Sequence, residues 1–203
     1  MEAPALAAET LRGSQEPSYP LDRLRRSSRQ GVAVGCPKVE LRRFQGKELQ
    51  FLPAAKVVEP FRERLLKLER VVREVSLRVY ARPPSAILVA ASYGCRSVRG
   101  KQRRLSEHAL GNAIDIAGFR FSPAAGSKSR GMPAALAQAF DVRVDQDWKG
   151  HGSALRRRHS RFLHELTAAL VERDIFRTLL GPAHRDHADH FHFDMAPEHY
   201  VDL

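Results

Sequence analysis

Apolar residues recur at helical spacing in two stretches of the chain, and each stretch predicts a long amphipathic helix. The first begins near Pro60, a residue that suits the first turn of a helix. Each stripe would lie on one face of its helix and pack on the core. The stripes are Phe61, Leu65, Leu68, Val72 and Val75, and then Leu155, Phe162, Leu163, Leu166 and Leu170.

Shorter apolar runs predict strands between and after these helices. Residues 86–90 (Ala-Ile-Leu-Val-Ala) form a buried run, and residues 111–119 add small residues where backbones approach closely. Further strands are expected over residues 139–148 and roughly 190–195, with Leu-Leu-Gly-Pro at 179–182 leading into the latter. A hairpin is expected where residues 39–41 and 48–51 flank Gly46, and loops over the basic 99–104 and the Gly-, Pro- and Ser-rich 122–133.

The order of these elements predicts the fold class. Helices and strands are mixed without regular alternation, which indicates an α+β fold. The 203 residues and 43% apolar content suit one globular domain with a sizeable core, placed here at residues 31–203. Residues 1–30 have little apolar periodicity and are expected to form a flexible or loosely attached N-terminal arm.

The net charge of +11 favours an anionic partner, such as nucleic acid, an acidic membrane face or an anionic cell-wall polymer. Simple solubility explains the charge equally well. No C2H2 spacing, RNP-like stretch or P-loop supports nucleic-acid binding. The run Arg156-Arg157-Arg158 is interpreted as the solvated face of a helix.

The two cysteines, Cys36 and Cys95, are compatible with one disulfide or with two free core thiols. No stretch is long and apolar enough to predict a transmembrane segment. The sequence does not open with the charged and then apolar segments of a signal peptide. The segment that begins at Met1 is compatible with a natural start without a targeting signal. It is equally compatible with an engineered start after removal of a signal peptide.

Four of the nine histidines lie between His184 and His192, where they alternate with Phe and Asp. On a strand, alternate side chains share a face, so His190, His192 and Asp194 would point the same way. The intervening phenylalanines would point into the core, which would fix the histidines on a rigid element.

A second polar pair, His108 and Asp115, lies in Ser-Glu-His-Ala-Leu-Gly-Asn-Ala-Ile-Asp. Asp115 falls inside an apolar strand and must therefore be paired or bound, since an isolated buried carboxylate is unfavourable. A salt bridge to an arginine is one solution. The other is a metal site in which His108, Asp115 and His192 leave one position open, as in catalytic zinc centres; imidazole and carboxylate ligands suit Zn²⁺.

Such a zinc site predicts a hydrolase, because the metal lowers the pKa of its water toward about 7 and polarises a carbonyl. Asp189 is the first choice for the general base, provided that the strand begins after it. His190 and His187 are the substitutes, either of which could also stabilise the oxyanion, and Asp186 is a weaker candidate. Arg96 could bind a substrate carboxylate, or be an ordinary surface or Asp-paired arginine.

These residues resemble known families. Ser-x-x-His-x-x-Gly-x-Ala-x-Asp followed by His-x-His resembles the LAS group of zinc peptidases, which includes D-Ala-D-Ala peptidases, lysostaphin-type and murein endopeptidases and the hedgehog domain. The bacterial extensin-like C-terminal domain family is a closer resemblance, running from about residue 32 to 194. It is carried by Ser92-Tyr-Gly-Cys-Arg96, by residues 105–119, by Asp147-Trp148-Lys-Gly150, and by Leu180-Gly-Pro with His187-Ala-Asp-His-Phe-His-Phe-Asp194.

The resemblance implies zinc ligation by His108, Asp115 and His192, with Asp189, His190 and His187 in the catalytic pocket and Arg96 near the substrate. It implies a LAS/hedgehog-like fold with a central antiparallel sheet flanked by helices. Members of the extensin-like family usually carry four cysteines. Other residues fill two of those positions here, near Val58-Glu59 and Ile175, which implies that Cys36 and Cys95 form the retained bridge.

Three functions compete on these grounds. The leading hypothesis is a periplasmic zinc metallopeptidase that cleaves stem-peptide cross-links of peptidoglycan by zinc-bound hydroxide attack, as a D,D- or L,D-endopeptidase or a carboxypeptidase, with or without an activating protein partner. The alternative is a non-catalytic zinc-containing module that binds the cell wall or a partner, since hedgehog domains use this scaffold for recognition. A charge-driven nucleic-acid binder is the third; it predicts steep salt dependence and no metal requirement.

Overall fold

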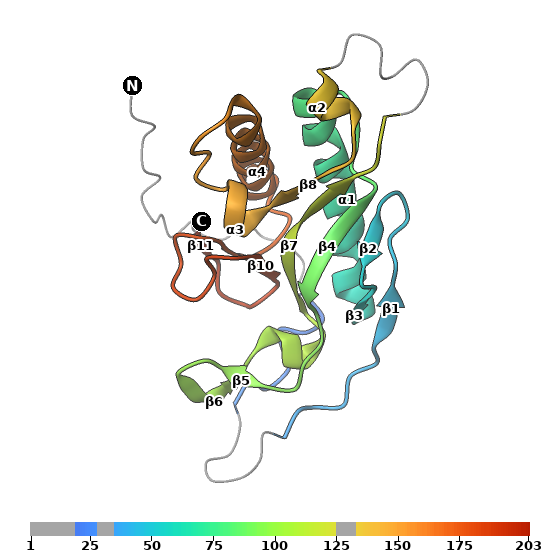
Figure 1. The fold of residues 1–203 in the computed structure, drawn as a ribbon. Coiled ribbons are helices and arrows are strands. Elements are labelled where there is room, and N and C mark those ends of the chain that lie inside the picture. Colours follow the sequence, from blue (N-terminus) through green and yellow to red (C-terminus); the bar gives the residue numbers. More distant parts are fainter. Residues whose placement is uncertain (1–18, 28–34, 125–132) are drawn as a thin grey trace.

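The computed structural model describes residues 19–27, 35–124 and 133–203. Within these ranges a seven-stranded sheet runs in the order β11-β9-β10-β7-β4-β2, with β8 also paired to β7 (Figure 1). The central pairs β4–β7, β7–β10, β7–β8 and β9–β10 are antiparallel, whereas the outer pairs β2–β4 and β9–β11 are parallel. The strands are β2 (Gln50–Leu52), β4 (Ala86–Ala91), β7 (Ala113–Phe121), β8 (Phe140–Arg143), β9 (Thr178–Leu180), β10 (Phe191–Asp194) and β11 (Tyr200–Asp202).

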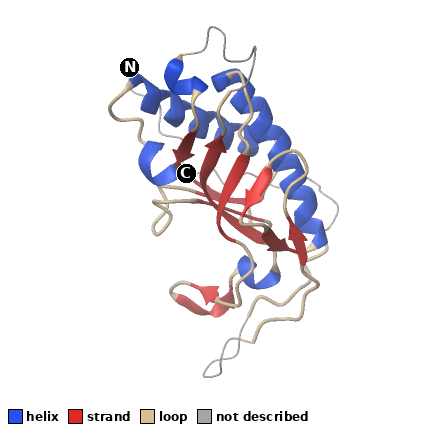
Figure 2. Cartoon of the chain, turned by 45° about the vertical axis from the view of Figure 1, so that its right-hand side comes forward, coloured by secondary structure: helices blue, strands red, loops and turns tan. Residues whose placement is uncertain are grey.

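Two long helices, α1 (Glu59–Tyr80) and α4 (Ala154–Glu172), pack against each other and on one face of this sheet (Figure 2). Their predicted apolar stripes supply the core: Phe162 of α4, for example, lies edge-on to Phe119 of β7, with ring centroids 5.2 Å apart. Pro60 occupies the first turn of α1, as expected. The α+β class and both helices are therefore confirmed.

Shorter elements complete the fold and supply the loops near the polar clusters. The single-turn helices are α2 (Ala134–Ala137), α3 (Val144–Asp147) and the 3₁₀ helix η1 (Glu107–Leu110). The remaining strands form two small ribbons, β1 (Arg42–Phe44) with β3 (Ala55–Val57), and β5 (Ser97–Val98) with β6 (Lys101–Leu105). The β5–β6 ribbon projects away from the main sheet (Figure 1).

The hairpin predicted around Gly46 is wrong. A turn does form there, because the buried carboxylate of Glu69 accepts hydrogen bonds from the backbone N–H groups of Lys47 and Glu48. The strands on either side of it pair elsewhere, β1 with β3 and β2 with β4. The sequence correctly indicated a turn, but long-range pairing rather than the turn determined the partner of each strand.

Three further expectations need correction. The basic segment 99–104 is not a loop but a ribbon, in which Gly100 (φ 73°) provides the turn between β5 and β6. The strand expected over 139–148 ends at Arg143, where α3 begins and the Asp147 carboxylate accepts a hydrogen bond from the Arg143 N–H. Residues 179 and 180, expected only to lead into the last predicted strand, lie in a strand of their own, β9. The strand β11 was not predicted. Of the loop expected over 122–133, residues 125–132 lie outside the described residues.

Residues 19–27, part of the expected N-terminal arm, pack on the domain. Tyr19 and Leu21 are buried, and Arg26 accepts a backbone hydrogen bond from Leu105. Arg177 donates to the carboxylate of Asp22 at 2.7 Å. The two apolar side chains were too few to give a periodic signal in the sequence. The rest of the expected arm, residues 1–18 and 28–30, lies outside the described residues.

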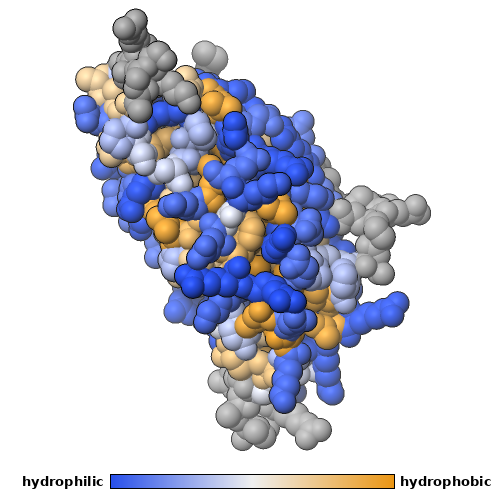
Figure 3. Space-filling model, turned by 90° about the vertical axis from the view of Figure 1, so that its right-hand side faces the viewer, coloured by the Kyte–Doolittle hydropathy of each residue, from blue (hydrophilic) through white to orange (hydrophobic). Residues whose placement is uncertain are grey.

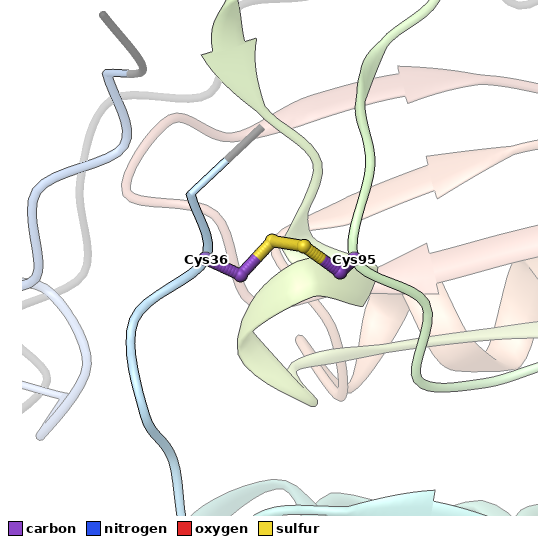
Figure 4. Close-up of a disulfide and its surroundings, with 2 residues drawn as sticks. All are labelled: Cys36 and Cys95. Carbon is purple, nitrogen blue, oxygen red and sulfur yellow. A yellow bond between two sulfur atoms is a disulfide. The ribbon is translucent and has the colours of Figure 1, made fainter. Parts of the chain in front are cut away.

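A disulfide joins Cys36 to Cys95, with their Cα atoms 5.8 Å apart (Figure 4). This confirms the bridge that the family resemblance implied. It ties the segment leading into β1 to the loop between β4 and β5, immediately before Arg96. Disulfides persist in oxidising compartments, so this bridge is compatible with an extracellular or periplasmic location.

The surface of the protein is mainly hydrophilic on the face shown in Figure 3. Hydrophilic side chains cover most of the face in Figure 3, and hydrophobic side chains form separate patches among them. None of the helices in the described ranges is long and apolar enough to cross a membrane.

We expect loss of the disulfide to destabilise the domain. The bridge closes a loop with a sequence separation of 59 residues, and loop-closure entropy of that size corresponds to as much as about 4 kcal/mol. Urea unfolding of the oxidised protein and of a Cys36→Ser/Cys95→Ser variant measures the difference. Equal unfolding free energies would contradict a structural role for the bridge.

Candidate metal centre

Two paired strands and one short helix bring the three predicted ligands together. Asp115 of β7 lies directly opposite His192 of β10 in the antiparallel register, so both side chains leave the same face of the sheet at close range. His108 reaches them from η1. The hydroxyl of Ser106 accepts from the His108 N–H at the start of that helix, and Gly111 (φ 65°) ends it in the left-handed region.

The potential ligand atoms of these residues converge. His108 Nε2 lies 3.1 Å from Asp115 Oδ1 and 3.2 Å from His192 Nδ1. His192 Nδ1 lies 2.8 Å from Asp115 Oδ1. All three side chains are buried. Ligands around a tetrahedral zinc ion stand about 3.4 Å apart, given bonds of about 2.0 to 2.1 Å, so the observed spacing fits one ion after small outward shifts.

The hydrogen-bond partners of the other ring nitrogens, His108 Nδ1 and His192 Nε2, show which nitrogens carry protons. His108 Nδ1 contacts the backbone oxygen of Ser92, which can only accept, so this nitrogen carries a hydrogen. His192 Nε2 donates to Asp194 Oδ2 at 2.8 Å. In their neutral forms both rings therefore direct lone pairs toward Asp115. Three electron-rich atoms facing one another need a proton or a metal cation between them, and backbone or carboxylate partners behind the histidines are typical of metal sites.

Without a metal, a proton occupies this position. Burial lowers the pKa of His192, but its hydrogen bonds to Asp115 and Asp194 outweigh burial and raise the pKa to about 9. Burial raises the pKa of Asp115, but hydrogen bonds with His108 and His192 outweigh it and hold this pKa well below its usual value. A metal ion would therefore displace a proton from His192, so metal affinity should fall as the pH is lowered.

A buried polar network holds the turn that carries His108. The side-chain amide of Asn112 donates to Glu107 Oε2 at 2.6 Å and to the backbone oxygen of Met195 at 3.2 Å, just beyond β10. Tyr19 donates to the Asn112 oxygen at 2.6 Å, and Arg26 forms a partly buried ion pair with Glu107 at 2.5 Å. The network thus connects η1, the end of β10 and the segment 19–27.

His190 lies between the candidate ligands and Asp189. Its Nδ1 donates to Asp189 Oδ1 at 2.7 Å, and its Nε2 lies 3.9 Å from Asp115 Oδ1. The strand begins after His190, so the condition set for Asp189 to approach the site is met. However, the Asp189 side chain is 76% exposed and lies behind His190. The geometry favours His190 as the proton acceptor and Asp189 as the group that orients it.

His187 and Arg96 border the same site. The His187 ring lies 4.9 Å from that of His190 and 5.7 Å from that of His192, between centroids. Burial lowers its pKa, and its Nδ1 donates to a backbone oxygen, so the neutral ring presents Nε2 as an acceptor. Arg96 Nη2 lies 3.7 Å from Asp115 Oδ2 while the side chain is 54% exposed, so Arg96 both faces the cluster and reaches solvent.

Asp186, the weaker candidate, is directed elsewhere: it pairs with Arg99 of the turn between β5 and β6 at 3.1 Å. The sequence reasoning gave no role to Asp194, although alternation had placed it on the face of His192. It included Ser92, Glu107 and Asn112 in the motifs of the family resemblance but gave them no role. Ser92 acts through its backbone, and the partners of Glu107 and Asn112 are distant in sequence, so no local pattern marks them.

Comparison with known families now adds to the geometry. The family described as "Extensin-like protein C-terminus" matches residues 22–130. The chain belongs to this extensin-like family. No curated protein and no solved structure matches the chain significantly. The family match includes Arg96, His108, Asp115 and both cysteines, and it ends before the strand that carries His192.

We expect Asp194→Asn to weaken zinc binding about 10-fold to 100-fold, because the amide would no longer fix the proton on His192 Nε2 as the carboxylate does. Titration of the apoprotein with zinc against a competing chelator measures the affinity. Asp141→Asn, which changes a carboxylate on β8 that pairs with Arg120, is the matched control. Unchanged affinity in a folded Asp194→Asn protein would contradict the assignment.

Proposed function

We propose that this protein is a zinc-dependent peptidase that cleaves stem-peptide cross-links of peptidoglycan, as a D,D- or L,D-endopeptidase. The observation that carries the proposal is the convergence of His108 Nε2, Asp115 Oδ1 and His192 Nδ1, with proton positions that leave three electron-pair donors facing one point. Zinc bound there would supply a Lewis acid for the scissile carbonyl and lower the pKa of a water molecule.

The chain's own residues would divide the remaining work. Asp189 accepts the Nδ1 proton of His190 and so leaves a lone pair on Nε2, on the side of Asp115. His190 can then take a proton from the attacking water and return it to the leaving amine. Arg96, partly exposed beside Asp115, is placed to bind a substrate carboxylate or the developing oxyanion.

The substrate class rests on three further arguments. The motifs of this chain resemble those of the LAS zinc peptidases, a relation that we also propose. The net charge of +11 suits a protein that acts on an anionic wall polymer. The disulfide is compatible with the periplasm, where such a substrate lies. A zinc-containing binding module is the alternative, but binding alone would give no reason for the His190–Asp189 pair.

Digestion of purified cross-linked peptidoglycan by the zinc-loaded protein, read by mass spectrometry, tests the proposal. We expect the wild type to cleave. His190→Ala should reduce the rate about 10²-fold to 10⁴-fold with zinc retained, as expected for loss of a general base. Asp189→Ala should reduce it less, and His192→Ala should lose both zinc and activity.

His151→Ala is the matched control, since His151 is exposed and lies outside the site. The fragment masses would identify the bond. If the wild type binds about one zinc per chain but leaves intact a substrate that a known endopeptidase cuts, the peptidase is contradicted and the binding module becomes the better hypothesis.

A further inference from the structure

A cleft of about 510 Å³ lies beside the metal centre, and Asp189 and His190 contribute to its lining. Ala117 of β7 also lines it, two residues beyond Asp115 on the same strand. Alternate residues of a strand share a face and stand about 7 Å apart. The cleft is therefore continuous with the candidate catalytic residues and lies within one or two peptide units of the ligands.

The floor of this cleft is built from small or apolar side chains of the sheet. It includes Leu88 and Ala90 of β4 and Ala117 of β7. The pairing of β4 with β7 shifts register between Leu88 and Ala91, an irregularity of the kind found next to active sites. Ala90 and Ala117 are both accessible to solvent, so an extended peptide could lie close to the sheet here.

Two arginines line the cleft, and they differ in their partners. Arg120 donates two hydrogen bonds of 3.0 Å to Asp141, so its charge is already matched by a bidentate partner. Arg143 lies 3.7 Å from Asp145 through Nε, a distance too long for a hydrogen bond. Arg143 and Asp145 both line the cleft, with side chains 36% and 40% exposed.

A ligand that carries only a carboxylate would meet Arg143 but would be repelled by Asp145. A ligand that carries only an amine would be attracted by Asp145 but repelled by Arg143. The loose pair therefore suits a zwitterionic group, with its carboxylate on the Arg143 guanidinium and its ammonium on Asp145. In the register, Arg143 lies opposite Gly118, three residues along β7 from Asp115, which corresponds to about 10 Å or three extended peptide units.

We infer that Arg143 and Asp145 form a specificity subsite for an amino-acid side chain that bears both an amine and a carboxylate. This subsite deepens the proposed peptidase function and rests on it. In peptidoglycan stem peptides the residue with such a side chain is diaminopimelate, whereas lysine, which replaces it in some walls, offers the amine alone. The subsite thus selects diaminopimelate-containing stem peptides, with neighbouring alanines over the floor at Ala90 and Ala117.

Measurement of peptide binding by calorimetry tests the subsite without cleavage of the peptide. The probes are the synthetic tetrapeptides L-Ala–γ-D-Glu–diaminopimelate–D-Ala and its lysine counterpart, added to the zinc-loaded His190→Ala protein. We expect the diaminopimelate peptide to bind about 10-fold to 100-fold more tightly than the lysine peptide, because its side-chain carboxylate adds one charged contact with Arg143. Adding Arg143→Gln should remove this preference, and adding Asp145→Asn should weaken binding of both peptides.

Arg70→Gln, on the exposed surface of α1, removes the same charge elsewhere and should keep the preference. Equal binding of the two peptides to the protein with Arg143 intact, or a preference that survives Arg143→Gln, would overturn the subsite. Digestion of cross-linked dimers of each tetrapeptide by the wild type separates the two proposals. Selective binding of the diaminopimelate tetrapeptide without cleavage of either dimer supports the subsite and contradicts the peptidase, whereas cleavage of both dimers at equal kcat/KM contradicts the subsite alone.

Discussion

The register between β7 and β10 is the constraint on which the rest of the site depends. It places Asp115 opposite His192, and it directs Phe191 and Phe193 into the core against Ile116 and Ile114. A slip of β10 by one residue would expose the phenylalanines and turn His192 and Asp194 toward the helices, away from Asp115. The hydrophobic core beneath α1 and α4 thus fixes the relative position of two candidate metal ligands, so core packing determines the geometry of the candidate site.

Burial of so many polar groups requires that each has a partner. Asp194 and the Ser92 carbonyl satisfy the outer nitrogens of the two histidines, and the Glu107–Asn112 pair satisfies the turn that carries His108. A partly satisfied network of this kind would be strongly unfavourable in a low-dielectric interior. The segment 19–27 completes it through Tyr19 and Arg26, which explains why residues remote in sequence belong to the stable part of the domain.

The partners of individual charged residues matter as well as the net charge of the chain. Several arginines in the described ranges pair with carboxylates on exposed surfaces, where such pairs contribute little to stability. Arg96 and Arg143 differ because each is held loosely, at 3.7 Å from its carboxylate, within or beside the candidate site. In the proposed function these two arginines, more than the net charge, would recognise anionic groups of the substrate.

The sequence by itself determined the two long helices and most strands of the sheet, because these follow from local periodicity. It also identified His108, Asp115 and His192 as candidate ligands, from their motifs and from the cost of burying Asp115 without a partner. It did not determine that β1 pairs with β3, that Asp189 stands behind His190, or that Arg26, Glu107, Asn112 and Tyr19 form one network. Those features depend on contacts between residues far apart in the sequence, which only the packed tertiary structure brings within hydrogen-bonding distance.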